Sequence, residues 1–179
     1  MNKVLKEFLN TSIYILIVLV LTYCVVTFIG QRTEVIGSSM EPTLSDGDNL
    51  IVDKMTYHFR EPKRFEIIVF PYQYIKDTYY IKRIIGLPGE TVSIDEQGRI
   101  YIDGEILKEA YGKEAILDAG LAAKEIVLAD DEYFVMGDNR NDSADSRFVS
   151  VGNIKRENIV GRAWLRIYPF NRMGVLKHI

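Results

Sequence analysis

Cysteine and histidine are both scarce in this sequence. Cys24 is the only cysteine among 179 residues, which excludes an internal disulfide, a multi-cysteine zinc site and a redox-active cysteine pair. The two histidines, His58 and His178, lie in a stretch of mixed charge and next to the last residue. Neither is well placed for a zinc hydrolase or a Ser-His-Asp triad, so a hydrolase built on this chain would need another base.

An excess of positive charge is missing as well. The formal net charge is −3, so the basic footprint of a nucleic-acid-binding protein is absent and no nucleic-acid partner is expected. Composition is ordinary for a globular protein. The length suits one domain, or one domain plus a membrane anchor, and is enough to bury a full hydrophobic core.

Charged residues are absent from Ser12 to Ile29, which reads SIYILIVLVLTYCVVTFI. A helix of about 18 residues spans about 27 Å, close to the hydrocarbon thickness of a bilayer. A cleaved secretory signal is one alternative, but the run is longer than a usual signal core and no small-x-small pattern follows it. A buried helix of a soluble protein is another, although such helices rarely lack charges on every face. The pattern favours an uncleaved transmembrane anchor over residues 12–30.

The charges around this anchor are distributed unevenly. Lys3 and Lys6 precede it, whereas Arg32 alone follows it closely, beside an acidic residue. The positive-inside rule then places the N-terminus in the cytoplasm. We expect a single-pass protein of the cell membrane, with residues 1–11 cytoplasmic and residues 31–179 forming one extracytoplasmic domain.

Beyond the anchor, short runs rich in Val, Ile, Tyr and Phe alternate with turn residues, as is typical of β structure. Asp103-Gly104 is a hairpin signal, and Leu87-Pro88-Gly89 is a turn that ends a strand. The stretch Lys108–Lys124, with alanines and mixed charges, is expected to be a loop with a short helix. The domain is therefore predicted to be mostly β. Strands are expected over Leu50–Asp53, Phe65–Phe70, Tyr79–Ile85, Thr91–Ile94, Ile100–Ile102, Glu125–Leu128, Tyr133–Met136 and Val160–Tyr168.

Three segments of this domain carry unusual residues, and the first is GSSMEPTL, residues 37–44. Ser38 and Glu41 have the spacing of a helix-capping box. However, Pro42 and the following Ser-Asp-Gly leave no periodic apolar run for such a helix to bury. A serine-rich turn is the ordinary interpretation of this segment.

The second segment, YYIKRIIGLPGE over residues 79–90, places two adjacent cations inside an apolar strand. Alternation puts Lys82 and Arg83 on opposite faces, and both faces have apolar neighbours, so the pattern does not decide which cation is buried. Burial lowers the pKa of a lysine, whereas arginine stays protonated. Only Lys82 could therefore act as a neutral base near pH 7. A lysine whose ammonium reaches solvent from a strand edge is the commoner case.

The third segment, MGDNRNDSADSR over residues 136–147, is dense in Asp and Asn. An EF-hand calcium loop is excluded because its glycine and glutamate positions do not match. Asn141-Asp142-Ser143 fits a glycosylation sequon, a short pattern that often matches by chance. Asp145 and Arg147, two residues apart, could pair on one side of an extended loop, so a polar surface loop held by this pair is the ordinary interpretation.

Together the strings SSMEPTL, YIKRIIGLPGE and MGDNRNDSADSR resemble the sequence boxes of the type I signal peptidases, which are membrane-bound serine proteases. They occur in the family's order, behind an apolar segment, and GRAWLRIYPF near the end also fits. The resemblance covers about residues 31–172. The short length and the lack of a large inserted domain are similar to the compact form of Gram-positive bacteria. The resemblance implies a compact β-barrel-like catalytic domain of the signal peptidase type behind a single N-terminal transmembrane helix.

The resemblance also implies roles for particular residues. Ser39, directly before Met-x-Pro-Thr, corresponds to the nucleophile, and Lys82 corresponds to the general base of a Ser-Lys dyad. Ser143 corresponds to the serine that orients the lysine. Asp145 and Arg147 would then brace the loop that carries it.

One position of the oxyanion site departs from the family's pattern. The backbone N–H of the nucleophile is one donor, and some family members supply a second from a hydroxyl two residues earlier. Gly37 stands at that position here. The hydroxyl of Ser38 and a backbone N–H are the remaining candidates.

The implied substrates are signal peptides of secretory preproteins, cut after a small-x-small site and bound as an added strand. The lipid bilayer is the second implied partner, and the export translocon is a further candidate; no cofactor or metal is expected. Five apolar residues are candidates for the substrate pocket, although each is more often plain core. They are Val35, Met40, Leu44, Tyr80 and Ile81.

Three other functions compete with this interpretation. A self-cleaving repressor-type Ser-Lys protease would be cytosolic and carry a DNA-binding helical domain, neither of which fits an anchor. An organellar or archaeal-type processing peptidase is a related alternative, and the archaeal type would have histidine in place of Lys82. A catalytically silent, membrane-tethered β-domain that binds export partners is the non-enzymatic alternative, and the presence of Ser39, Lys82 and Ser143 argues against it.

Overall fold

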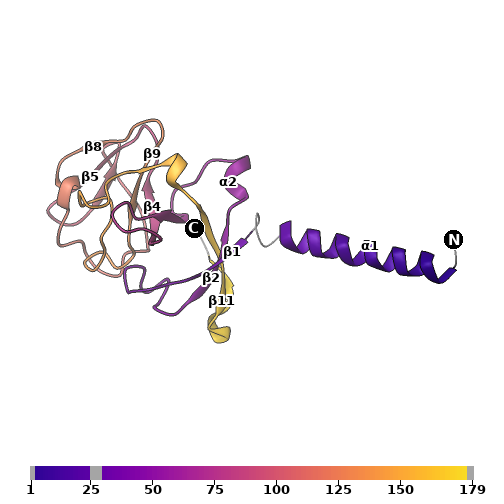
Figure 1. The fold of residues 1–179 in the computed structure, drawn as a ribbon. Coiled ribbons are helices and arrows are strands. Elements are labelled where there is room, and N and C mark those ends of the chain that lie inside the picture. Colours follow the sequence, from indigo (N-terminus) through magenta and orange to yellow (C-terminus); the bar gives the residue numbers. More distant parts are fainter. Residues whose placement is uncertain (1–2, 25–29, 177–179) are drawn as a thin grey trace.

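The computed structural model describes residues 3–24 and 30–176 (Figure 1). Its first element is the helix α1 (Lys3–Cys24), which begins nine residues before the predicted Ser12. The anchor was predicted to begin at Ser12 because the residues before it include charged ones. Lys, Leu and Glu are good helix formers, so the helix also includes this preceding segment. Its apolar window Leu5–Tyr23 has a mean hydropathy of 1.6 and is long enough to cross a bilayer, with 0% of it buried inside the protein. Residues 25–29 of the predicted anchor lie outside the described residues.

The main sheet of the domain is antiparallel and places the last long strand of the chain between two early ones. The first strand along the chain lies at one edge of this sheet. Eight strands form the sheet, in the order β1 (Gly30–Glu34), β2 (Asn49–Asp53), β11 (Gly161–Tyr168), β3 (Ile67–Pro71), β4 (Tyr79–Gly86), β9 (Glu132–Met136) and β10 (Ile154–Lys155), with β12 (Gly174–Val175) paired to β11.

A smaller four-stranded sheet has the order β7 (Glu105–Ile106), β6 (Ile100–Ile102), β5 (Thr91–Ile94) and β8 (Ile126–Val127). Figure 1 shows β5 and β8 on the side of the domain opposite β1, β2 and β11. Asp103 and Gly104 join β6 to β7 with φ values of 50° and 80°, as the predicted hairpin turn requires. Within residues 3–24 and 30–176, the remaining elements are one short helix and three 3₁₀ turns: α2 (Thr56–Phe59), η2 (Gly120–Ala123), η3 (Arg156–Asn158) and η4 (Phe170–Arg172).

All eight strands expected from the sequence are present, and the domain is mostly β as predicted. Of the other four strands, β7 follows the predicted hairpin turn. Strands β1, β10 and β12 were not anticipated, because they are short or lack apolar residues at alternate positions. The segment 108–124 is a loop that contains η2, which agrees with the expected loop and short helix.

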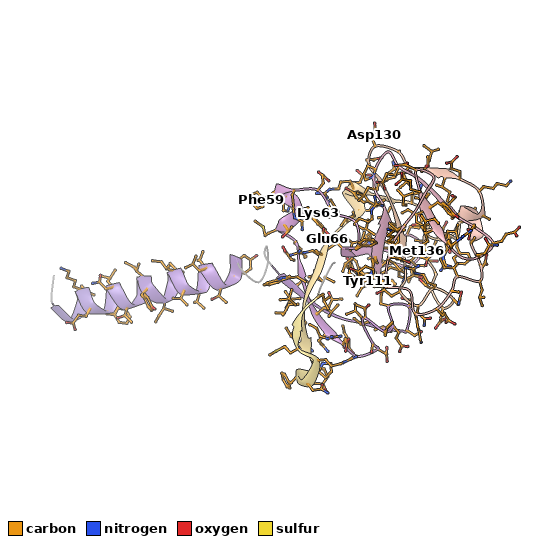
Figure 2. The ribbon with its side chains drawn as sticks, turned by 180° about the vertical axis from the view of Figure 1, so that it is seen from behind. Phe59, Lys63, Glu66, Tyr111, Asp130 and Met136 are labelled. Carbon is orange, nitrogen blue, oxygen red and sulfur yellow. The ribbon has the colours of Figure 1, made fainter. Side chains whose placement is uncertain are left out.

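Among the described residues, the hydrophobic core forms three clusters. One lies between the small sheet and β9 and includes Ile85, Val92, Phe134 and Met136. Figure 2 shows Met136 deep among the side chains of the domain. A second lies between β3, β4 and β9. The third packs beneath the turn that follows β1, and it supports the residues described next. Its members are Val35, Met40, Leu44, Leu50, Ile67, Ala163 and Leu176.

Candidate active site

The side chains of Ser39 and Lys82 meet at the surface of the main sheet. Lys82 Nζ lies 2.7 Å from Ser39 Oγ, within hydrogen-bonding distance. Ser39 belongs to the turn between β1 and β2, and Lys82 lies in the middle of β4. The structure therefore brings together the two residues that the first and second sequence segments single out.

Lys82 is only 4% exposed, and this burial has an electrostatic consequence. Loss of hydration lowers the pKa of Lys82 from 10.5 to about 8, while the carboxylates of Asp145 and Asp138 act in the opposite direction. The ring of Tyr80, whose centroid is 5.1 Å from Nζ, also favours the charged form. Lys82 consequently titrates close to neutral pH and can accept a proton there.

The loop after β9 holds the turn that carries Ser39. The N–H of Asn139 donates to the carbonyl oxygen of Ser39 at 3.1 Å. The side-chain amide of Asn139 donates to the carbonyl oxygen of Ser38 at 3.2 Å. The peptide groups of both serines are thus tied to the third sequence segment.

Gly137 lies at the closest point between this loop and Ser39. A Cβ at Gly137 would lie 2.4 Å from the carbonyl oxygen of Ser39 and 2.3 Å from Ser143 Oγ, so only glycine fits. Ser143 is therefore close to the nucleophile. Its Oγ is buried and has no hydrogen-bond partner among the described residues, and this arrangement contains no bond from Ser143 to Lys82. The orienting role of Ser143 remains a prediction.

Asp145 and Arg147 form a buried ion pair rather than a surface pair, with exposures of 0% and 1%. Arg147 Nε donates to Asp145 Oδ1 at 2.8 Å. Asp145 Oδ2 accepts from the N–H of Gly137 at 3.0 Å. Arg147 also donates to the carbonyl oxygen of Arg140 at 2.5 Å, so the pair fixes both ends of the loop that approaches Ser39.

A second buried ion pair was not identified from the sequence. Arg83 donates to Asp138 through Nε at 2.8 Å and Nη2 at 2.6 Å, and both side chains are 0% exposed. Thr43 Oγ1 donates to the same carboxylate at 2.5 Å. Strand alternation left open whether Lys82 or Arg83 is inside; both are buried, on opposite faces of β4. The sequence offered one indication of this pair: Asp138, next to Gly137 in the third segment, had no predicted role.

A cleft of about 530 Å³ opens beside the Ser39–Lys82 pair. Its two walls are the segment 33–40 and the segment 77–82. Of the five predicted pocket residues, Val35, Met40, Tyr80 and Ile81 line it.

Leu44 was wrongly assigned to this pocket, because it is fully buried in the core. The N–H of Leu44 donates to the carbonyl oxygen of Met40 at 2.9 Å, as in a single helical turn. This turn directs Leu44 into the cluster beneath Met40, and Met40 alone reaches the cleft.

Two strand edges face the cleft without a neighbouring strand in the described sheet. β1 pairs only with β2. In β4, the pairing with β9 begins at Arg83, so Tyr79–Lys82 pairs with β3 alone. Backbone groups of an extended peptide could bind to either edge.

The hydroxyl of Ser38 is engaged elsewhere. It donates to Asp142 Oδ2 at 2.5 Å, and a hydroxyl has only one proton to donate. The N–H of Gly37 donates to Asp46 Oδ1 at 2.7 Å. Of the two candidates for the second oxyanion donor, this arrangement favours a backbone N–H over the Ser38 hydroxyl. Within the described part of the chain, no group of three or more His, Cys, Asp or Glu residues is placed to hold a metal ion.

Several known proteins are similar to this chain. The family model described as signal peptidase, peptidase S26, matches residues 6–168. A probable signal peptidase I-2 from a Synechocystis species is 41% identical over 84% of this chain and 68% of its own length. Signal peptidase I P from Bacillus subtilis subsp. natto is 36% identical over 89% of this chain and 88% of its own length. The crystal structure of a signal peptidase I from Enterococcus faecalis matches 57% of this chain and 97% of its own, with 32% identity and a TM-score of 0.45.

Proposed function

Because this chain belongs to the signal peptidase family, peptidase S26, we propose that it cleaves signal peptides with a catalytic dyad of Ser39 and Lys82. Membership makes it a serine endopeptidase of the signal peptidase I type, and removal of signal peptides from secretory preproteins is its function. The observation that carries the dyad is the 2.7 Å approach of Lys82 Nζ to Ser39 Oγ at a buried site.

The proposed reaction follows from the pKa of Lys82. In its neutral form, Nζ takes the proton of Ser39 Oγ as this oxygen attacks the scissile carbonyl carbon. The resulting ammonium then protonates the leaving amine of the mature protein, which leaves an acyl group on Ser39. A water molecule, deprotonated by Lys82, hydrolyses this ester and restores the enzyme. A pKa of about 8 permits both steps near neutral pH.

The proposed substrate binding uses the two strand edges at the cleft. An extended peptide that adds to β1 or to Tyr79–Lys82 of β4 directs every second side chain to the same wall. Val35 and Met40 are almost fully buried in that wall, so only a small part of each side chain is open to a bound peptide. This supports cleavage after a small-x-small sequence, in which the two small side chains face one wall.

We further propose a single-pass topology, with the N-terminus in the cytoplasm, one membrane anchor, and the domain from residue 31 onward outside. The anchor predicted over residues 12–30 is assigned instead to Leu5–Tyr23, the apolar window of the helix, which is about 28 Å long. The few residues between Cys24 and Gly30 can span at most about 20 Å, so the cleft stays near the bilayer surface. The bilayer and the export translocon are the partners that this placement implies.

Thiol labelling of intact cells tests this orientation. In a Cys24→Ser background, a membrane-impermeant thiol reagent should label Gln97→Cys, which lies in an exposed turn, and should not label Asn2→Cys. Labelling of Asn2→Cys alone would show the reverse orientation.

The dyad is tested with the full chain in detergent and a secretory preprotein as substrate. Ser39→Ala and Lys82→Met should each abolish cleavage after the small-x-small site. Ser150→Ala and Lys155→Met, which alter an exposed serine and an exposed lysine, should cleave as the wild type does. Cleavage that survives Lys82→Met would disprove the lysine base. A folded wild-type chain that cleaves no preprotein would instead favour the tethered binding domain.

A further inference from the structure

The carboxylate of Asp48 is almost fully buried, at 1% exposure, at the end of the turn that carries Ser39. It accepts hydrogen bonds from the N–H of Ser45 at 3.0 Å, from Arg166 Nη1 at 2.9 Å and from Arg172 Nη2 at 2.5 Å. Its backbone closes the same turn, because the carbonyl oxygen of Asp48 accepts from the N–H of Val35 at 2.8 Å. No step of the proposed reaction uses this carboxylate.

The two arginines come from the C-terminal part of the domain. Arg166 lies in β11 and Arg172 in η4. Arg166 also donates to the carbonyl oxygen of Thr43 at 3.0 Å and, through Nε, to the carbonyl oxygen of Arg172 at 2.8 Å. Arg172 Nη1 donates to Ser45 Oγ at 3.1 Å. These bonds tie the end of the chain to the turn at several points.

Thr43 connects this cluster to the active site. Its carbonyl oxygen accepts from Arg166, and its hydroxyl donates to Asp138, which is paired with Arg83 next to Lys82. The C-terminal segment and the Arg83–Asp138 pair therefore both contact the turn through Thr43. They act beside the loop after β9, where Asn139 donates to the carbonyl oxygens of Ser38 and Ser39.

Hydrogen bonds within the turn hold its own shape, for example from the N–H of Leu44 to the carbonyl oxygen of Met40 at 2.9 Å and from the N–H of Gly47 to that of Val35 at 2.9 Å. Gly37 and Gly47, near its two ends, have φ values of 94° and 80°, which glycine adopts without strain. Glycine also gives the backbone its greatest freedom at these two points, so hydrogen bonds to other elements help to hold the turn in place against the sheet. Asp48 accepts two of these bonds, from Arg166 and Arg172.

We propose that Asp48 is a positioning residue, which holds Ser39 against Lys82 through its ion pairs with Arg166 and Arg172. The proposal rests on the dyad described above. Arg172 lies beyond residue 168, where the family match ends, so one arm of this arrangement comes from outside the matched region. The same arrangement explains why a buried carboxylate with two cationic partners occurs at this turn.

The test is the rate and pH dependence of preprotein cleavage by Asp48→Asn in the full chain. We expect kcat to fall at least about tenfold with little change in KM, since a displacement of about 1 Å at the reacting atoms can cost a hundredfold. The turn also covers Lys82, so a loosened turn admits water and raises the pKa of Lys82 from about 8 toward its ordinary value. The acid limb of the kcat/KM profile should shift to higher pH.

Glu90→Gln is the matched control. Glu90 accepts from the N–H of Leu87 at 2.8 Å and from Arg64 at 2.5 Å and 2.9 Å, so it also joins a turn to an arginine, but away from the cleft. This variant should lose stability without a change in kcat or in the acid limb. An equal loss of kcat in Glu90→Gln would show that Asp48 acts only through general stability.

A second variant covers the case in which Asp48→Asn does not fold. Arg172→Gln removes one arm from a side chain that is 38% exposed, and it should lower kcat and shift the acid limb in the same direction by a smaller amount. The proposal would be overturned if folded Asp48→Asn had the kcat and the acid limb of the wild type. If only Arg172→Gln folds, the same result for that variant would overturn it. A failure of the proposed dyad would be detected separately, because Ser39→Ala would then still cleave the preprotein.

Discussion

Arg83 and Asp138 form an ion pair in which neither side chain is exposed to solvent, one residue along β4 from Lys82. Successive residues of a strand point to opposite faces, so the same strand presents the lysine to the cleft and the arginine to the interior. Arginine keeps its charge when it is buried, and its guanidinium here lies 3.6 Å from the ring centroid of Tyr111 and donates to the carbonyl oxygen of Phe65. The buried carboxylate is the counter-charge that this placement requires.

Loss of that counter-charge should be costly. Asp138→Asn leaves Arg83 buried without its partner charge, and breaking a buried pair in this way costs about 3–5 kcal/mol of unfolding free energy. The free energy would be measured by urea unfolding in detergent. Glu41→Gln breaks an exposed pair with Lys113, at 43% and 36% side-chain exposure, and should cost about 0.2–1 kcal/mol. Equal losses in both variants would contradict this account of the buried pair.

The lowered pKa of Lys82 makes a prediction about stability as well as activity. Below about pH 8, Lys82 is protonated in both the folded and the unfolded chain, and the folded state bears the full cost of the buried charge. The shift from 10.5 to about 8 corresponds to about 3 kcal/mol. This cost diminishes as pH rises from 8 toward 10.5. Lys82→Met should therefore unfold at higher urea than wild type at pH 7, and the difference should shrink at pH 9.5.

The pH dependence of cleavage also follows from the lowered pKa of Lys82. Cleavage by wild type, measured as kcat/KM, should rise through about pH 8 as Lys82 loses its proton. A profile that is flat from pH 6 to pH 9 would place the titration of the base elsewhere.

Local patterns in the sequence were sufficient to predict much of this structure. Strand positions followed from β-branched and aromatic runs, and the hairpin at Asp103 from its turn chemistry. The placement of Ser39, Lys82 and Ser143 came from the resemblance of three short segments, and the structure brings these segments together.

Contacts between distant parts of the chain were not predictable in this way. Asp48 and Arg172 are 124 residues apart, and Arg83 and Asp138 are 55 apart. Nothing local distinguishes such a carboxylate from a solvated one. Leu44 shows the same difficulty. Met40 and Leu44 are four residues apart in one turn, and the sequence does not show which of them faces the cleft and which faces only the core.

Gly137 should tolerate no side chain. An alanine Cβ would lie 2.4 Å from the carbonyl oxygen of Ser39, and this backbone atom can move only if the nucleophile moves with it. We expect Gly137→Ala to lower kcat about a hundredfold or more. Gly174→Ala is the control, since its Cβ would meet no atom within 4 Å, and it should cleave at the wild-type rate. Normal cleavage by Gly137→Ala would show that the loop yields without moving Ser39.

Ser143→Ala separates a catalytic role from a structural one. The Oγ of Ser143 is buried without a hydrogen-bond partner among the residues described, so its removal relieves an unsatisfied polar group. Unfolding free energy should stay the same or rise by up to about 1 kcal/mol. If the hydroxyl orients Lys82 during the reaction, kcat should nevertheless fall about a hundredfold, because a poorly aligned base transfers its proton slowly. Urea unfolding and preprotein cleavage by one preparation measure both quantities. An unchanged kcat would remove Ser143 from the catalytic machinery, whereas a drop in both kcat and stability would assign it to packing.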